Sequence, residues 1–174
     1  MKKADIVSKD EKQEWFYSEE VKRHFFNPYK FMKDEDDPSS PKAARGTKKF
    51  EFDGMGQVGS PACGDVMKLW IKVDKKTKKI IDCRWRTYGC GSAIASTSAL
   101  AEMITENGGM SIEDALKIKP QDIMARLGGL PEIKIHCSVL GDQALRAAIE
   151  DYNKKIKSEA RNPKQMGKIQ NPNV

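Results

Sequence analysis

The sequence predicts an α+β fold in which helices pack on a small, mainly antiparallel sheet of three strands. Two segments that alternate between apolar and polar residues, 66–73 and 80–88, are joined by a polar turn and predict a β-hairpin. From residue 93 onward, small-residue and amphipathic segments bounded by glycine and proline are typical of helices.

The N-terminal part predicts one short helix, one loop and one strand. Residues 15–26 form the helix, which Ser18 can cap and Pro28 ends. Residues 33–49 are polar, contain proline and serine and lack periodicity, so we expect a flexible loop. Residues 55–60 supply the third strand of the sheet.

The predicted hairpin brings two cysteines together. Its turn lies at 74–79, and the residues that share a face are Met67, Leu69, Ile71 and Val73 on the first strand and Ile81, Cys83, Trp85 and Thr87 on the second. If the turn is centred between Lys76 and Thr77, Cys63 and Cys90 lie side by side at the open end of the hairpin. Cys83 is expected to be a small buried hydrophobic residue of its strand.

The C-terminal half predicts four helices. The first, 93–109, has almost only small residues in its first two turns, so it can pack closely against its neighbours. The other helices are expected at 111–118, at 120 to about 127 and at about 138–157, with an exposed loop at 130–134. His24, on the N-terminal helix, is interpreted as a surface or packing residue.

The length of 174 residues suits one domain, expected at 15–157, between a flexible N-terminus of residues 1–14 and a basic, disordered tail of residues 158–174. The net charge is +6, but residues 153–174 hold six Lys and Arg against one Glu, so they carry +5 of it. This segment has no aromatic residue to stack on bases, so nucleic-acid binding is not expected.

Cysteine usage indicates metal binding or reactivity. No apolar run reaches the roughly 18 residues of a membrane span, and the N-terminus lacks a signal-peptide stretch. We therefore expect a cytoplasmic protein without a membrane partner, in which thiols stay reduced. The four cysteines are then better explained as ligands or reactive groups than as two disulfides.

Five candidate ligands cluster at the ends of predicted elements: Cys63, Asp65, Cys90, His136 and Cys137. Cys90 and Cys137 precede helices, whose N-termini favour thiolate over thiol. The glycine and the acid in "SPACGD" indicate a solvent-reachable loop, and the glycines beside the cysteines leave room for a bulky inorganic group. The set could hold zinc or an iron–sulfur cluster, and its lack of a Cys-x₂₋₄-Cys pair favours an open site that exchanges ligands.

Four motifs in order, "GSPACGDVMKLWIKVD", "YGCGSAIASTSALAEMI", "EDALKIKPQDI" and "IHCSVLGDQALRAAIEDY", resemble the iron–sulfur cluster assembly scaffolds of the IscU type and the N-terminal domain of NifU. The resemblance implies that Cys63, Cys90 and Cys137 bind a transient [2Fe–2S] cluster and accept sulfur, with Asp65 and His136 as variable fourth ligands. It also implies a cysteine desulfurase and acceptor proteins as partners, zinc in the apo form, and a monomer or homodimer.

The resemblance also implies partner-binding residues at Leu130, Pro131 and Lys134. The chaperone-recognition segment of the IscU type reads Leu-Pro-Pro-Val-Lys, whereas this chain has "LPEIK" at 130–134. The loss of the second proline favours the NifU type, while a chaperone stays among the implied partners. The SufU-type zinc proteins carry an insertion between the second and third cysteines and lack His136, so that subtype fits less well.

The function expected is that of a scaffold and not of an enzyme. It would accept sulfur, bind iron, hold a labile cluster and pass it on. Two alternatives stay open: a zinc-dependent sulfur acceptor that relays persulfide, and a zinc-stabilised interaction module.

Overall fold

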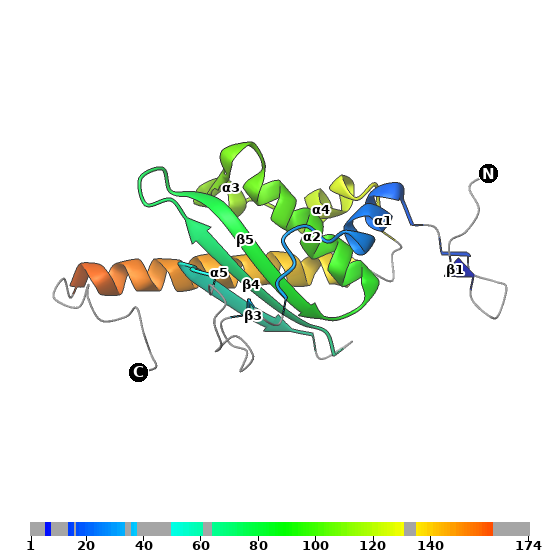
Figure 1. The fold of residues 1–174 in the computed structure, drawn as a ribbon, viewed down its shortest axis with the longest axis horizontal. Helices are drawn as coiled ribbons and strands as arrows, with labels where there is room; N and C mark the ends of the chain where they lie inside the picture. Colours follow the sequence, from blue (N-terminus) through cyan, green and yellow to red (C-terminus); the bar gives the residue numbers. More distant parts are fainter. Residues whose placement is uncertain are drawn as a thin grey trace.

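A computed structural model describes most of the chain. The described residues are 6–7, 14–15, 17–33, 36–37, 50–60, 64–130 and 135–161, with the backbone alone for 6–7, 14–15, 135–138 and 161. The long helices α2 (Gly91–Thr105) and α5 (Ile135–Arg161) pack on one face of a β-sheet (Figure 1). The predicted α+β class is confirmed.

The main sheet has four antiparallel strands, one more than expected. Their order is β3 (Gly54–Gly59), β4 (Val66–Val73), β5 (Lys79–Tyr88) and β6 (Met110–Ser111). The extra strand β6 has only two residues, which pair with Lys79 and Ile80 at the start of β5. A strand this short has no alternation from which it could be predicted. A separate antiparallel pair joins β1 (Ile6–Val7) to β2 (Glu14–Trp15).

The predicted hairpin is confirmed, with one irregularity. Val66 pairs with Tyr88 and Ile71 pairs with Cys83. The register shifts between Lys72 and Val73, and Val73 then pairs with Ile80. Ile80 is therefore fully buried, whereas Ile81, which was expected on the inner face, is 44% exposed. A β-bulge explains the error, because one extra residue turns the following side chains to the other face.

The helices lie close to their predicted places, except that the first begins at Glu19 instead of residue 15, because Trp15 lies in strand β2. They are α1 (Glu19–Phe26), α2 (Gly91–Thr105), the 3₁₀ turn η2 (Glu106–Gly108), α3 (Ile112–Ala115), α4 (Pro120–Arg126) and α5 (Ile135–Arg161). Ser18 caps α1 as expected, accepting a hydrogen bond from the backbone N–H of Val21. Helix α5 begins before residue 138 and runs to Arg161, past the expected end at 157. Residues 162–174 of the expected tail lie outside the described part of the chain.

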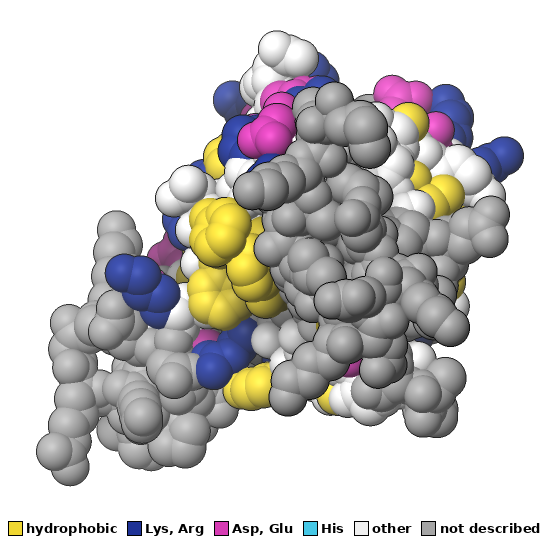
Figure 2. Space-filling model, turned by 90° about the vertical axis from the view of Figure 1, so that its right-hand side faces the viewer, with side chains coloured by type: hydrophobic (Ala, Val, Ile, Leu, Met, Phe, Trp, Pro, Cys, Tyr) yellow, Lys and Arg dark blue, Asp and Glu magenta, His cyan; other side chains and the backbone are white. Residues whose placement is uncertain are grey.

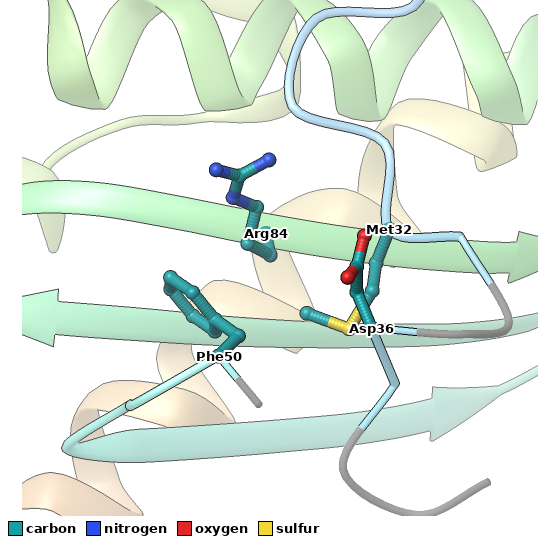
Figure 3. A pocket seen from close by; sticks show the side chains of 4 residues that line it. All are labelled: Met32, Asp36, Phe50 and Arg84. Atoms are coloured by element: carbon teal, nitrogen blue, oxygen red, sulfur yellow. The ribbon is translucent and has the colours of Figure 1, made fainter. Parts of the chain in front are cut away.

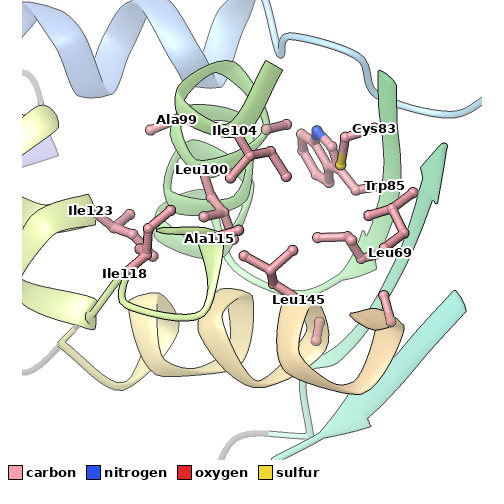
Figure 4. Packing of buried hydrophobic residues seen from close by; sticks show 14 of the residues in the cluster. Leu69, Cys83, Trp85, Ala99, Leu100, Ile104, Ala115, Ile118, Ile123 and Leu145 are labelled. Atoms are coloured by element: carbon pink, nitrogen blue, oxygen red, sulfur yellow. The ribbon is translucent and has the colours of Figure 1, made fainter. Parts of the chain in front are cut away.

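The core lies between the sheet and the helices. Helix α2 packs on β5, and α5 packs on β3 and β4 (Figure 4). Cys83 and Trp85 are fully buried, which confirms the structural role expected of Cys83. Burial raises the pKa of the Cys83 thiol, so this group stays protonated and chemically quiet. No helix in the described ranges combines the length and the apolar character that a membrane span needs.

The outer face of the sheet is also covered near its centre. Trp70 points away from the helices, yet it is only 1% exposed. Met32, Asp36, Phe50 and Arg84 line a cavity of about 140 Å³ on this face (Figure 3). Arg84 precedes Cys90 by six residues of mostly extended chain, which corresponds to about 20 Å. The cavity therefore lies away from the end of the hairpin.

Helix α5 lies unusually close to the edge strand β3. A Cβ on Gly54 would collide with the carbonyl oxygen of Ala148, and a Cβ on Gly56 would collide with that of Ala144. The side chain of Asp151 reinforces this contact by accepting a hydrogen bond of 2.9 Å from the backbone N–H of Met55. The two glycines let the helix backbone rest directly on the strand.

Replacing Gly56 by Ala is expected to lower the free energy of unfolding by about 3 kcal/mol, because the new methyl group must push a backbone carbonyl aside. Urea denaturation measures the change. Gly59→Ala is the matched control on the same strand, since its nearest neighbours would lie 3.7 and 3.9 Å from the new Cβ. Equal stability of the two variants would contradict the close approach of α5.

Candidate functional site

The elements that carry the predicted ligands meet at one end of the molecule. Strand β4 begins where β5 ends, and α2 and α5 both begin at that end (Figure 1). Gly141 of α5 packs against α2, because a Cβ there would lie 3.8 Å from the Thr97 hydroxyl oxygen. The two helix N-termini are therefore held side by side by the core.

Asp65 is anchored at the start of β4. The backbone N–H of Ser60 donates to the Asp65 carbonyl at 2.9 Å, and the N–H of Gly64 donates to the Ser60 carbonyl at 2.8 Å. Gly64 has a φ of +72°, which favours glycine in this tight loop. The loop was expected to be reachable by solvent, but Asp65 itself is only 7% exposed, so this expectation was wrong for the acid.

The carboxylate of Asp65 lies against Gly89, directly before Cys90. A Cβ on Gly89 would lie 2.9 Å from both Cγ and Oδ2 of Asp65. Atom Oδ2 is buried and has no hydrogen-bond partner among the described residues. Burying a carboxylate oxygen without a partner is costly, and such an atom in a folded protein calls for an explanation. A cation bound beside Cys90 would supply the missing partner.

Cys90 is the N-cap of α2, which confirms its predicted place at a helix N-terminus. It is half-buried and extended, with φ −75° and ψ 168°, and its carbonyl accepts the first helical hydrogen bond from Ile94 at 3.1 Å. Cys90 therefore stands at the positive end of the α2 dipole, and helix N-termini in general favour the thiolate, which is the form that binds metals.

An aromatic side chain covers the other glycine beside Cys90. A Cβ on Gly91 would lie 3.1 Å from the ring of Phe25, which is 41% exposed and makes an edge contact with Phe26. Figure 2 views this end of the molecule and shows hydrophobic side chains gathered on it. The glycines were expected to leave free space for an inorganic group. Asp65 and Phe25 take up the space next to Gly89 and Gly91, whereas none of the described residues comes within 4 Å of a Cβ on Gly64.

The remaining predicted ligands are placed by backbone only or lie outside the description. His136 and Cys137 were expected to precede the last helix, but both lie in the first turn of α5. Their side chains are outside the described set. Cys63, two positions before Asp65 in the sequence, also lies outside the described residues. Leu130 is half-buried against the core, while Pro131 and Lys134 lie outside the description.

The described side chains alone do not form a complete metal site. Among them, no three His, Cys, Asp or Glu residues come together as ligands. Asp65 and Cys90 are the two predicted ligands whose side chains are described, and the carboxylate of Asp65 lies against Gly89, the residue before Cys90. Sequence reasoning missed Phe25 as a part of this site, and it missed the contact between Gly89 and Asp65. The hairpin register would have located Gly89, because pairing of Val66 with Tyr88 puts Asp65 next to it.

Comparison with known proteins agrees with this architecture. Residues 16–159 match the model of the NifU-like N-terminal domain. The chain belongs to this family. The "Nitrogen fixation protein NifU" of Trichormus azollae is 44% identical over 140 residues, which are 79% of this chain and 42% of that protein. The "Iron-sulfur cluster assembly protein 1" of Arabidopsis thaliana is 45% identical over 140 residues, 80% of this chain and 74% of that protein.

Solved structures support the fold of the NifU-like domain. The NifU-like N-terminal protein of Brucella abortus superposes with a TM-score of 0.52 at 16% identity, covering 79% of this chain and 94% of that one. At this identity the likeness concerns the fold alone. The chain spans about two fifths of the length of the NifU protein it matches.

A charged network holds α1, and with it Phe25, against α2 and α4. Arg23 donates to Glu102 at 2.8 Å, and Arg126 of α4 approaches the same carboxylate at 3.3 Å. The hydrogen bond from Arg23, together with that from Arg126, lowers the pKa of Glu102 to about 2. Glu102 therefore stays ionised at all ordinary pH values. Ser18 also donates a hydrogen bond to the carbonyl of Leu127 at the end of α4.

His24 is the buried member of this network and confirms the expectation of a packing role. Its side chain is fully buried, with Nδ1 2.7 Å from the Ser98 hydroxyl and Nε2 2.9 Å from Nη2 of Arg23. Because arginine only donates hydrogen bonds, Nε2 must accept and Nδ1 must carry the proton. Burial and the Arg23 charge lower the pKa of His24, although Glu102 and Glu20 oppose this shift.

This burial predicts acid sensitivity of α1 docking. Because the folded pKa of His24 lies below the unfolded value of about 6.5, the unfolded chain binds the proton first. The stabilisation is complete above about pH 6.5 and is lost as the pH falls from there through the folded pKa. In urea denaturation at pH 7.5 and 5.5, His24→Gln is expected to lose less stability between the two values than the wild type. Equal losses would contradict the assignment.

Proposed function

We propose that the chain is a scaffold on which iron–sulfur clusters are assembled and from which they are passed to acceptor proteins. The proposal rests on the buried carboxylate of Asp65, next to the residue before the N-cap Cys90, in a chain of the NifU-like family. Its atom Oδ2 has no hydrogen-bond partner among the described residues. Relatives named for nitrogen fixation and for iron–sulfur cluster assembly support the same class of function. The protein would carry and release its cargo instead of turning over a small-molecule substrate.

Sulfur would enter by exchange between persulfide and thiolate. A thiolate of Cys63, Cys90 or Cys137 attacks the outer sulfur of a persulfide on a cysteine desulfurase, and the donor cysteine leaves as thiolate. Such attack needs the thiolate form, which the helix N-termini at Cys90 and Cys137 favour. Ferrous iron and an external reductant then supply the electrons that convert the bound sulfur to sulfide.

The three cysteines would hold the [2Fe–2S] cargo, with Asp65 or His136 at the fourth position. Carboxylate is a hard oxygen ligand, whereas iron in such clusters favours thiolate, so this position keeps the cluster exchangeable. Three thiolates and one carboxylate also suit tetrahedral zinc in the apo protein. A zinc-dependent sulfur acceptor is therefore the second candidate function, favoured by the same carboxylate.

The proposal also includes a partner surface, a location and an oligomeric state. Leu130, Pro131 and Lys134 would contact a partner, either the desulfurase or a chaperone. A cytoplasmic location and a monomeric or homodimeric state also stay predictions.

Replacing Cys63, Cys90 or Cys137 by Ala is expected to abolish cluster formation, because each would remove one of three thiolate ligands. Anaerobic reconstitution with iron, cysteine and a desulfurase, followed by visible absorption, measures this loss. Cys83→Ala is the matched control and should reconstitute, since this thiol is fully buried in the core. If the wild type accepts persulfide and binds zinc but forms no cluster, the zinc-dependent acceptor is the better description.

Replacing Asp65 by Ala is expected to lengthen the lifetime of the reconstituted cluster and to slow its transfer, each severalfold. The variant loses the hard ligand and relieves the repulsion between the carboxylate and three thiolates, and His136 can take the fourth position. Decay of the visible bands in the presence of a chelator and transfer to an apo-ferredoxin measure both effects. Faster decay than in the wild type would identify Asp65 as an ordinary anchoring ligand.

A further inference from the structure

Gly89 has no conformational reason to be glycine. The described glycines with positive φ are Gly64, Gly108, Gly109, Gly128 and Gly129. Gly89 is not among them, so its φ does not require glycine. Another feature of position 89 must account for the missing side chain.

The space where a Cβ of residue 89 would lie is filled by a carboxylate. The new carbon would be 2.9 Å from Cγ and Oδ2 of Asp65 and 3.0 Å from the hydroxyl oxygen of Thr87. Contacts under 3.0 Å are essentially never seen for a real Cβ, so the carboxylate would have to shift.

Asp65 can shift only at its side chain, because its backbone is held on both sides. The N–H of Ser60 donates to the Asp65 carbonyl at 2.9 Å, and the hydroxyl of Thr87 donates to the carbonyl of Val66, also at 2.9 Å. A Cβ on residue 89 would therefore rotate the carboxylate away from position 89. The displaced group is the one whose Oδ2 has no partner among the described residues.

We propose that Gly89 is a positioning residue of the site: its bare α-carbon seats the Asp65 carboxylate beside Cys90, where the carboxylate meets the incoming divalent metal ion. The inference rests on the proposed function, because it assigns the carboxylate to metal capture. Gly89 itself binds nothing and acts only through Asp65.

Titration of Co²⁺ into the metal-free full chain tests this role, because the visible bands of Co²⁺ report its ligands. Gly89→Ala is expected to weaken Co²⁺ binding about tenfold, which is the effect typical of groups that orient a metal ligand. It should also change the visible bands in the same way as Asp65→Ala. In the Asp65→Ala background, adding Gly89→Ala should change the affinity by less than about twofold, since the side chain it would displace is gone.

Gly59→Ala is the matched control and should bind Co²⁺ like the wild type. It also stands beside Asp65, but its Cβ would lie 3.7 Å from the Asp65 carbonyl oxygen. Unchanged binding in Gly89→Ala, unchanged binding in Asp65→Ala, or a further tenfold loss in the double variant would each overturn the proposal. If Gly89→Ala does not fold by circular dichroism, the double variant decides: recovery of the fold supports the proposal and failure to fold overturns it.

The same experiment separates this role from the proposed function. If the wild type reconstitutes a cluster and Gly89→Ala binds Co²⁺ unchanged, only the role of Gly89 fails. If the wild type reconstitutes no cluster while the double-variant comparison holds, the scaffold function fails and the positioning of Asp65 at a metal site stands.

Discussion

Helix α2 touches the sheet and three other helices at once because its first two turns carry almost only small side chains. Its buried hydroxyls are satisfied: Ser96 and Thr97 donate to the carbonyls four residues earlier, at 2.7 and 2.8 Å, and Ser98 bonds to His24 of α1. The helix can therefore be surrounded on nearly all sides without leaving polar groups unsatisfied. Since α2 begins immediately after Cys90, the packing that fixes the helix also fixes this cysteine.

The proposed site at Cys90 would have to bind two different species, a single metal ion and an iron–sulfur cluster. A lone divalent cation is held well by a carboxylate, whereas an iron–sulfur cluster prefers thiolate at every position. Under the proposed function, the same Asp65 helps to capture iron and loosens the finished cluster. The buried position of Asp65 strengthens both effects, because charges interact more strongly where water is excluded.

Local patterns predicted much of this arrangement, and its deviations are all non-local. The alternation of β4 and β5 was sufficient for the hairpin, and the cap at Ser18 for α1. The outward turn of Ile81 was not foreseen, because the bulge depends on how two strands pair. The burial of Asp65 was missed for a similar reason: its sequence neighbours are Gly64 and Val66, whereas its carboxylate lies against Gly89, which follows the partner strand. The ligand roles of Cys63, His136 and Cys137 are predictions from the sequence.

The contact between α5 and β3 affects the far end of the helix. A helix of 27 residues moves as a rigid rod, and Cys137 stands in its first turn, seven residues and about 10 Å before Ala144. The depth at which Ala144 and Ala148 rest on Gly56 and Gly54 therefore sets where the helix carries Cys137 relative to Cys90. Under the proposed function, strand β3 would therefore influence the spacing of these two ligands. Under that function, substitutions on β3 in related chains would change how firmly the cluster is bound without changing a ligand.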